Sequence, residues 1–105
     1  MIAKRNKAQT FIGFAVRKNA VKINVNTIAT LKKAFLLVVC STAGENTKKK
    51  SLSLSKRFNC DIITMTDGTL GELLNKENAK VVAITDEGLA KAIKEYSFEG
   101  FKEGV

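Results

Sequence analysis

The sequence predicts an α/β protein, a three-layer α/β/α sandwich with a four-stranded mixed sheet. Two continuous apolar runs, Phe35–Cys40 and Val81–Ile84, are typical of strands that are buried on both faces. Between such runs, apolar residues recur with the 3.6-residue period of a helix. A chain of 105 residues can bury one core without disulfides or metal, so we expect a single domain over residues 1–105.

Strands and helices are expected to alternate along the chain. The predicted strands cover residues 21–23, 35–40, 61–65 and 81–84, the first of them as an edge strand. The predicted helices cover residues 6–18, 26–33, 42–57, 69–74 and 86–96. Their expected N-caps include Asn24 or Asn26, Ser41 or Thr42, and Thr85 or Asp86. The SLSLS run in the third helix also alternates like a strand, and the tail 97–105 is expected to be frayed.

Charge is distributed unevenly along the chain. The first 57 residues contain thirteen Lys and Arg and one acid, Glu45, whereas the last 48 contain five bases and nine acids. These parts carry +12 and −4, which gives the overall +8. The split predicts one positive side facing a polyanion, and nucleic acid is the obvious candidate. The alternative is a Lys-rich protein whose charges are simply solvated.

Several chemistries lack the residues they need. The chain has no His and no C-x-x-C, so we expect no metal, no cofactor and no catalytic residues. Cys40 and Cys60 are interpreted as buried thiols in a reducing cytoplasm. The segment Gly44–Ser51 superficially resembles a phosphate-binding P-loop, but Lys49 occupies the position where that loop has its second Gly. Its lysines would instead face solvent or RNA phosphates.

Membrane insertion and base stacking also find little support. No apolar run approaches the roughly 20 residues of a membrane span, and no apolar segment follows the basic Met1–Lys7 as in a signal peptide. Base stacking needs exposed aromatics beside cations. Four phenylalanines are expected on core faces, namely Phe11, Phe14, Phe35 and Phe58. Only the tail could then offer stacking rings.

Four segments resemble a known family. LLVVCSTAGENTKKK (Leu36–Lys50) and AKVVAITDEGLAKAI (Ala79–Ile93) are similar to segments of bacterial YlxQ-like ribosomal proteins. Phe11–Ala15 fits their opening helix, and Leu70–Leu73 fits their short helix. These proteins belong to the kink-turn RNA-binding superfamily of ribosomal proteins L-seven-Ae and L-thirty-e. The resemblance covers about residues 8–95 in order. It implies the ribosomal kink-turn-binding protein fold and a non-enzymatic RNA-binding function, with the ribosome as a candidate partner.

The resemblance also implies a site. Family members grip RNA through Gly-x-Asn-Glu-x-x-Lys at the start of the second helix, and here Asn24 falls at the Gly and Asn26 at the Asn. Thr27 replaces the Glu and Thr30 replaces the Lys. Nearby lysines would contact phosphates, and the loop before the last strand would close on the RNA. The expected RNA-binding residues are Lys22, Asn24, Asn26, Thr27, Thr30, Lys32, Lys33, Asn75 and Lys76. The alternative is a protein-interaction module of the same fold that has lost RNA binding.

Overall fold

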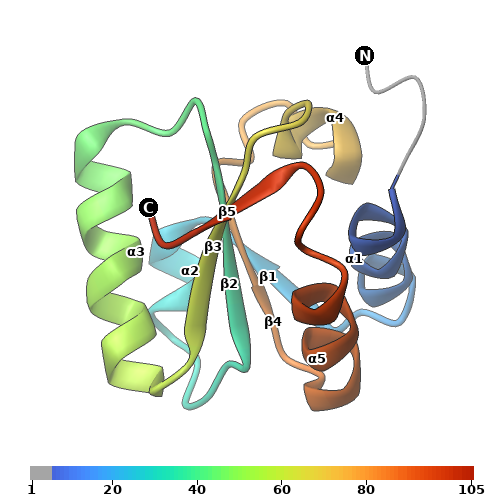
Figure 1. The fold of residues 1–105 in the computed structure, drawn as a ribbon. Coiled ribbons are helices and arrows are strands. Elements are labelled where there is room, and N and C mark those ends of the chain that lie inside the picture. Colours follow the sequence, from blue (N-terminus) through green and yellow to red (C-terminus); the bar gives the residue numbers. More distant parts are fainter. Residues whose placement is uncertain (1–5) are drawn as a thin grey trace.

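The computed structural model describes residues 6–105, in which helices and strands alternate (Figure 1). The helices are α1 (Lys7–Arg17), α2 (Val25–Ile28), α3 (Glu45–Phe58), α4 (Leu70–Leu74) and α5 (Glu87–Glu95). The strands are β1 (Val21–Ile23), β2 (Leu36–Cys40), β3 (Asp61–Met65), β4 (Val81–Ile84) and β5 (Phe101–Glu103). The α/β class predicted from the sequence is confirmed.

One mixed sheet contains all the described strands, in the order β1-β4-β2-β3-β5. Strands β2 and β3 are parallel, and the other neighbours are antiparallel. The sheet therefore has five strands instead of the predicted four. The prediction of a frayed tail was wrong, because β5 pairs with β3 and two further contacts hold the end of the chain. The Gly104 amide donates to the Ile62 carbonyl at 2.9 Å, and the Thr64 hydroxyl donates to the Gly104 carbonyl at 2.7 Å.

Helices cover both faces of the sheet (Figure 1). On one face, α1, α4 and α5 pack through residues such as Ile12, Leu73 and Ile93. On the other face, α2 and α3 pack through Ile28 and Leu54. Strand β2 supplies both clusters by alternation, since Leu36, Val38 and Cys40 join the first and Leu37 and Val39 join the second. Its continuous apolar run is therefore explained by burial on two sides.

Helix boundaries differ from prediction in two places. Helix α3 begins at Glu45 with Gly44 as its N-cap, so neither Ser41 nor Thr42 caps it. The SLSLS run is helical, and Ser51 and Ser55 donate their hydroxyls to carbonyls of the preceding turn. Serine can satisfy its hydroxyl in this way inside a helix, and Leu54 of the same run packs inward against the sheet.

The second discrepancy is α2, which is a single turn where eight residues were expected. Arg57, near the end of α3, donates from Nη2 to the carbonyls of Ala29 and Leu31 at 2.9 and 3.0 Å. These carbonyls lie just beyond the helix, where they have no partner from a continuing helix. A tertiary contact thus stabilises the early end of α2.

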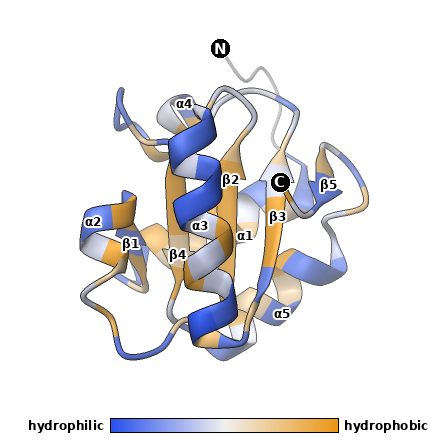
Figure 2. Ribbon diagram, turned by 90° about the vertical axis from the view of Figure 1, so that its left-hand side faces the viewer, coloured by the Kyte–Doolittle hydropathy of each residue, from blue (hydrophilic) through white to orange (hydrophobic). Residues whose placement is uncertain are grey.

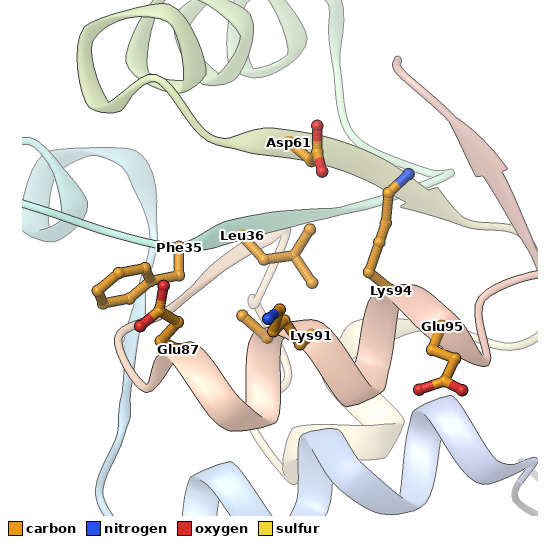
Figure 3. A pocket seen from close by; sticks show the side chains of 8 residues that line it. Phe35, Leu36, Asp61, Glu87, Lys91, Lys94 and Glu95 are labelled. Carbon is orange, nitrogen blue, oxygen red and sulfur yellow. The ribbon is translucent and has the colours of Figure 1, made fainter.

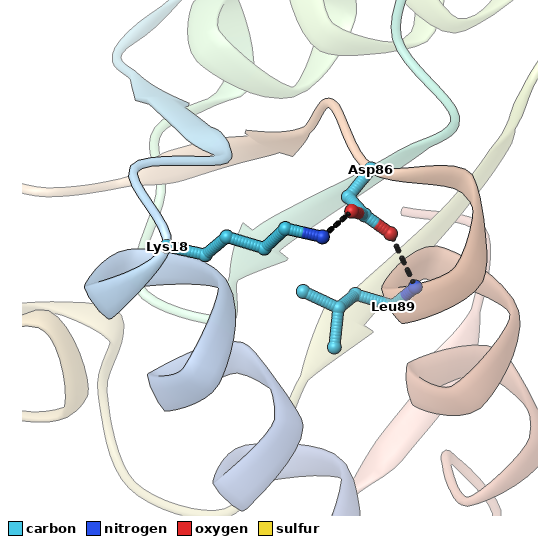
Figure 4. Close-up of polar contacts among 3 residues, drawn as sticks. All are labelled: Lys18, Asp86 and Leu89. Carbon is cyan, nitrogen blue, oxygen red and sulfur yellow. Dashed lines mark hydrogen bonds and ion pairs between the residues drawn. The ribbon is translucent and has the colours of Figure 1, made fainter.

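The start of α5 is fixed by Asp86, one of the two caps predicted for it (Figure 4). One carboxylate oxygen accepts the Leu89 amide at 2.9 Å, and the other accepts Lys18 Nζ from the end of α1. The hydrogen bond from Lys18, followed by that from the Leu89 amide, holds the pKa of this carboxyl below its ordinary value of 3.8. Asp86 therefore joins the ends of two helices that are far apart in sequence.

We expect Asp86→Ala to lower the midpoint of thermal unfolding at pH 7. Because the folded-state pKa is lowered, this stabilisation is present above about pH 3.8 and is lost as pH falls through the folded-state value. The difference from the unchanged protein should therefore shrink in acid. Melting curves followed by circular dichroism between pH 2 and 7 measure it, with the exposed Glu99→Ala as control. If Asp86→Ala lowered the melting temperature by the same amount at every pH down to 2, the ionised carboxylate of Asp86 would not be the source of the stabilisation.

Candidate nucleic-acid interface

Positive charge is concentrated on the layer formed by α2 and α3. Residues 21–58, which form β1, α2, β2 and α3, contain eight bases and one acid, a net +7. The other described residues, 6–20 and 59–105, contain eight bases and nine acids, a net −1. Lys4 and Arg5 lie outside the described residues. We call the cations of β1 and α3 the basic face; its members are Lys22, Lys48, Lys49, Lys50, Lys56 and Arg57.

Helix α3 presents much of the basic face. Figure 2 shows the outer side of this helix as largely hydrophilic, while the strands behind it are hydrophobic. Leu54 and Phe58 bury the inner side against the sheet, and Lys49, Lys50 and Lys56 are exposed. Lys22 joins the same side, because its neighbours Val21 and Ile23 pack against the opposite cluster and side chains alternate along a strand. The local pattern of α3 thus produces one buried and one cationic flank.

Most of the predicted site gathers at one end of the sheet. The Asn24 amide donates to the Val81 carbonyl at 2.9 Å, so the start of α2 lies beside the first residue of β4. The loop with Asn75 and Lys76 leads into that strand, and Lys80 Nζ donates to the Thr42 hydroxyl at 3.1 Å. The α2 turn, the loop before β4 and the loop before α3 therefore share this end. Asn26, Thr27, Asn75 and Lys76 are all exposed there.

Lys32 and Lys33 lie elsewhere. They come just before β2, and the amide of Phe35 donates to the carbonyl of Ile84, the last residue of β4. The five residues of β2 span about 17 Å, so these lysines are at the opposite end of the sheet from Asn24. Lys33 Nζ instead lies 5.0 Å from the centre of the Phe35 ring. That ring packs against the cluster on the α1, α4 and α5 side, so these lysines lie apart from the basic face and are not brought together with the predicted motif.

Two of the motif residues have defined local roles. Asn24 has φ 74° and ψ 144°, close to a backbone region that is essentially restricted to glycine, and its side chain makes no cap hydrogen bond. The hydroxyl of Thr30 donates to the Thr27 carbonyl at 2.6 Å, which closes the turn. That hydroxyl keeps only its acceptor capacity for a ligand. Thr30 therefore cannot supply the cation that a lysine would.

Sequence reasoning did not assign Lys50 to the site. A groove of about 230 Å³ lies between α2 and α3, and its lining includes Asn26, Lys50 and Ser53 beside the apolar Val25 and Leu54. A predicted motif residue and an unassigned cation thus face one groove. The signal was present, since residues 50, 53, 54 and 57 share one flank of a helix. It was missed because the position of α2 against that flank depends on tertiary contacts such as those of Arg57.

A larger hollow of about 600 Å³ lies between α5 and the starts of β2 and β3 (Figure 3). Its polar lining is mixed, because Asp61, Glu87 and Glu95 alternate with Lys91 and Lys94. Carboxylates at three positions disfavour a phosphate chain there. The groove beside Asn26 is therefore the better polyanion site, although it is smaller.

The remaining sequence expectations concern reactive groups. Both cysteines are free, but Cys60 is only half-buried where a buried thiol was expected. Burial, followed by the neighbouring Asp61, raises the pKa of Cys60 to about 11, so its thiol stays protonated at neutral pH. Among residues 6–105, no three His, Cys, Asp or Glu side chains gather in a way that could hold a metal ion. Within the same residues, no helix is long and apolar enough to cross a membrane.

Fold and surface together define an α/β domain with one basic face. No family model matches the chain, and no curated protein matches it. A solved structure of a protein of unknown function from Bacillus halodurans is similar, with a TM-score of 0.74 and 21% identity over 88% of this chain and 97% of that chain. At this identity the likeness concerns the fold alone.

Proposed function

We propose that this chain is a non-enzymatic protein that binds structured RNA in the cytoplasm, as a diverged YlxQ-like relative of the kink-turn-binding ribosomal proteins. The ribosome is the candidate partner. Contacts come from polar side chains at the α2 turn and from lysines on the basic face. The observation that carries the proposal is the backbone of Asn24. It has the positive φ that glycine readily adopts, at the position where the family motif has glycine.

The groove and the charge add independent support. Asn26, at the family's Asn position, is exposed and lines the groove that also contains Lys50. An amide can both donate to and accept from base edges, and a lysine beside it can contact the backbone phosphate. The net +7 on residues 21–58 supplies attraction for any polyanion. Specificity is then assigned to the amides and affinity to the cations.

The substitutions define how this site departs from its relatives. Thr27 offers a short neutral hydroxyl where a Glu would accept from a guanine, and Thr30 removes a phosphate contact. Lys50 lies across the groove from Asn26 and supplies a cation from α3 instead. We propose that Lys50 replaces, from a different helix, the charge missing at Thr30.

Asn26→Ala tests the assignment of specificity. We expect it to weaken binding of a kink-turn RNA roughly tenfold, because a base-edge contact contributes about 1–3 kcal/mol of discrimination. Binding to a plain duplex of equal length should change little. Fluorescence anisotropy with labelled RNAs measures both affinities. Asn46→Ala, which removes an exposed amide from the first turn of α3, should leave both unchanged. Equal losses on kink-turn and duplex RNA would contradict a specific site at Asn26.

A further inference from the structure

A second groove lies on the flank of α3 that faces away from α2. Figure 2 shows α2 on one side of α3 and the C-terminal end of the chain on the other. On this second side a groove of about 220 Å³ separates α3 from β5, and we call it the β5-side groove. Its lining consists of Glu45, Lys48, Lys49, Leu52, Lys102 and Val105. Three lysines from two separate elements therefore meet at one hollow.

Strand β5 brings Lys102 to this groove. Side chains alternate between the two faces of a sheet along a strand. Phe101 packs against the cluster on the α1, α4 and α5 side, and Glu103 pairs with Lys94 of α5. Lys102, between them, therefore points to the face that α3 covers. Because β5 pairs with β3 over all three of its residues, the sheet itself fixes the backbone of Lys102 beside α3.

The charge of the β5-side groove is not neutralised internally. Within residues 6–105, Lys48, Lys49 and Lys102 make no ion pair, whereas two lysines of the opposite layer are paired with carboxylates. Three lysines and one glutamate give the side chains of the lining a net +2. Glu45 lies in the first turn of α3, where the helix dipole already favours a negative charge. The lysines are therefore available to an external anion.

The two grooves beside α3 lie on different flanks of that helix. Each residue turns an α-helix by about 100°, so the side chains of Lys48 and Lys50 are about 200° apart around its axis. Lys50 lines the groove that contains Asn26, and Lys48 lines the β5-side groove. A helix with its side chains is about 10–12 Å across. A phosphate held beside Lys50 therefore leaves the lysines of the β5-side groove unoccupied.

We propose that the β5-side groove is a second phosphate-binding site for the RNA. Lys48, Lys49 and Lys102 contact a stretch of backbone that is separate from the stretch beside Lys50. A folded RNA can present two such stretches to one face of a protein, and α3 then lies between them. This inference rests on the proposed RNA binding. It adds to that function a residue, Lys102, from the part of the chain whose net charge is negative.

Anisotropy titrations of the full chain with the kink-turn RNA across salt test the contribution of Lys102. We expect Lys102→Glu to lower the affinity about tenfold at 0.1 M salt. The slope of log affinity against log salt should fall by about one, because one phosphate contact is lost. Lys102→Ala removes the cation without adding a negative charge and should reduce the slope equally. Lys91→Glu, at an exposed position of α5, is the matched control and should leave the slope unchanged.

Ethylation interference on the same RNA tests whether the two stretches are separate. Ethylation removes the charge of a phosphate, so it weakens binding wherever that phosphate contacts a cation. Lys102→Glu should abolish the interference at one stretch of backbone, and Lys50→Glu should abolish it at another. Loss at the same phosphates, or an unchanged salt slope in both Lys102 variants while the unchanged protein still binds RNA, would overturn the second site alone. If the unchanged protein bound neither kink-turn nor duplex RNA, the proposed function would fail as well.

Discussion

Reversing the charges of Lys49 and Lys50 is expected to lower the affinity for RNA on the order of a hundredfold at 0.1 M salt. Both side chains are exposed on α3, and Lys50 lines the groove that contains Asn26. Each lost phosphate contact should reduce the slope of log affinity against log salt by about one, so the slope should fall by about two. Anisotropy titrations of Lys49→Glu/Lys50→Glu across a series of salt concentrations measure both quantities.

The matched control reverses two cations on the other layer. Lys7→Glu/Lys91→Glu changes the net charge by the same amount, but both residues lie outside the basic face, at exposed positions of α1 and α5. We expect a loss of affinity well below that of the α3 variant, and an unchanged salt slope. If both double variants lost affinity equally, RNA would be responding to overall charge and not to the basic face.

Replacing Asn24 by glycine or by alanine is expected to change the free energy of unfolding in opposite directions. Asn24→Gly should raise the free energy of unfolding by about 1 kcal/mol, because relief of about 1–3 kcal/mol of backbone strain exceeds the entropic cost of glycine, about 0.5–1 kcal/mol. Asn24→Ala should lower the free energy of unfolding. A Cβ atom disfavours φ 74° in both residues, but asparagine tolerates a positive φ better than alanine does. Urea denaturation followed by circular dichroism measures these changes.

Asn59 provides the comparison for Asn24. It caps α3 with φ 54° and ψ 46°, a left-handed conformation that asparagine adopts routinely. Asn59→Gly should therefore stabilise the protein less than Asn24→Gly does. An equal gain at the two positions would mean that Asn24 is no more strained than an ordinary helix cap. The correspondence between Asn24 and the family's glycine would then lose its physical basis.

The sheet was predictable wherever burial alone decides the structure. Leu36–Cys40 and Val81–Ile84 are apolar throughout because their side chains pack alternately into clusters on both faces of the sheet. A continuous apolar run in the sequence is enough to predict this burial. Asp86 was also predictable as a cap, because its carboxylate acts on an amide three residues away. These features depend on neighbours in sequence, so sequence patterns reveal them.

The features that sequence missed depend on distant partners. Helix α2 ends early where Arg57 binds the carbonyls of Ala29 and Leu31, and β5 forms because Thr64 and Ile62 hold Gly104. For the same reason, periodicity assigned Phe14 to the core, although its side chain is 43% exposed. The candidate site was predicted in part. Asn24–Thr27 and Asn75–Lys76 share one end of the sheet, Lys32 and Lys33 lie at the other, and Lys50 was left out.

The most direct test of the central claim compares a kink-turn RNA with a plain duplex of the same length and composition, titrated across salt. Phosphate contacts weaken steeply as salt rises, whereas discrimination between the two RNAs by base-edge contacts is much less sensitive. We predict that the protein prefers the kink-turn and that the preference persists at high salt. Equal affinities for the two RNAs, lost together as salt increases, would contradict structure-specific recognition and leave only a cationic surface.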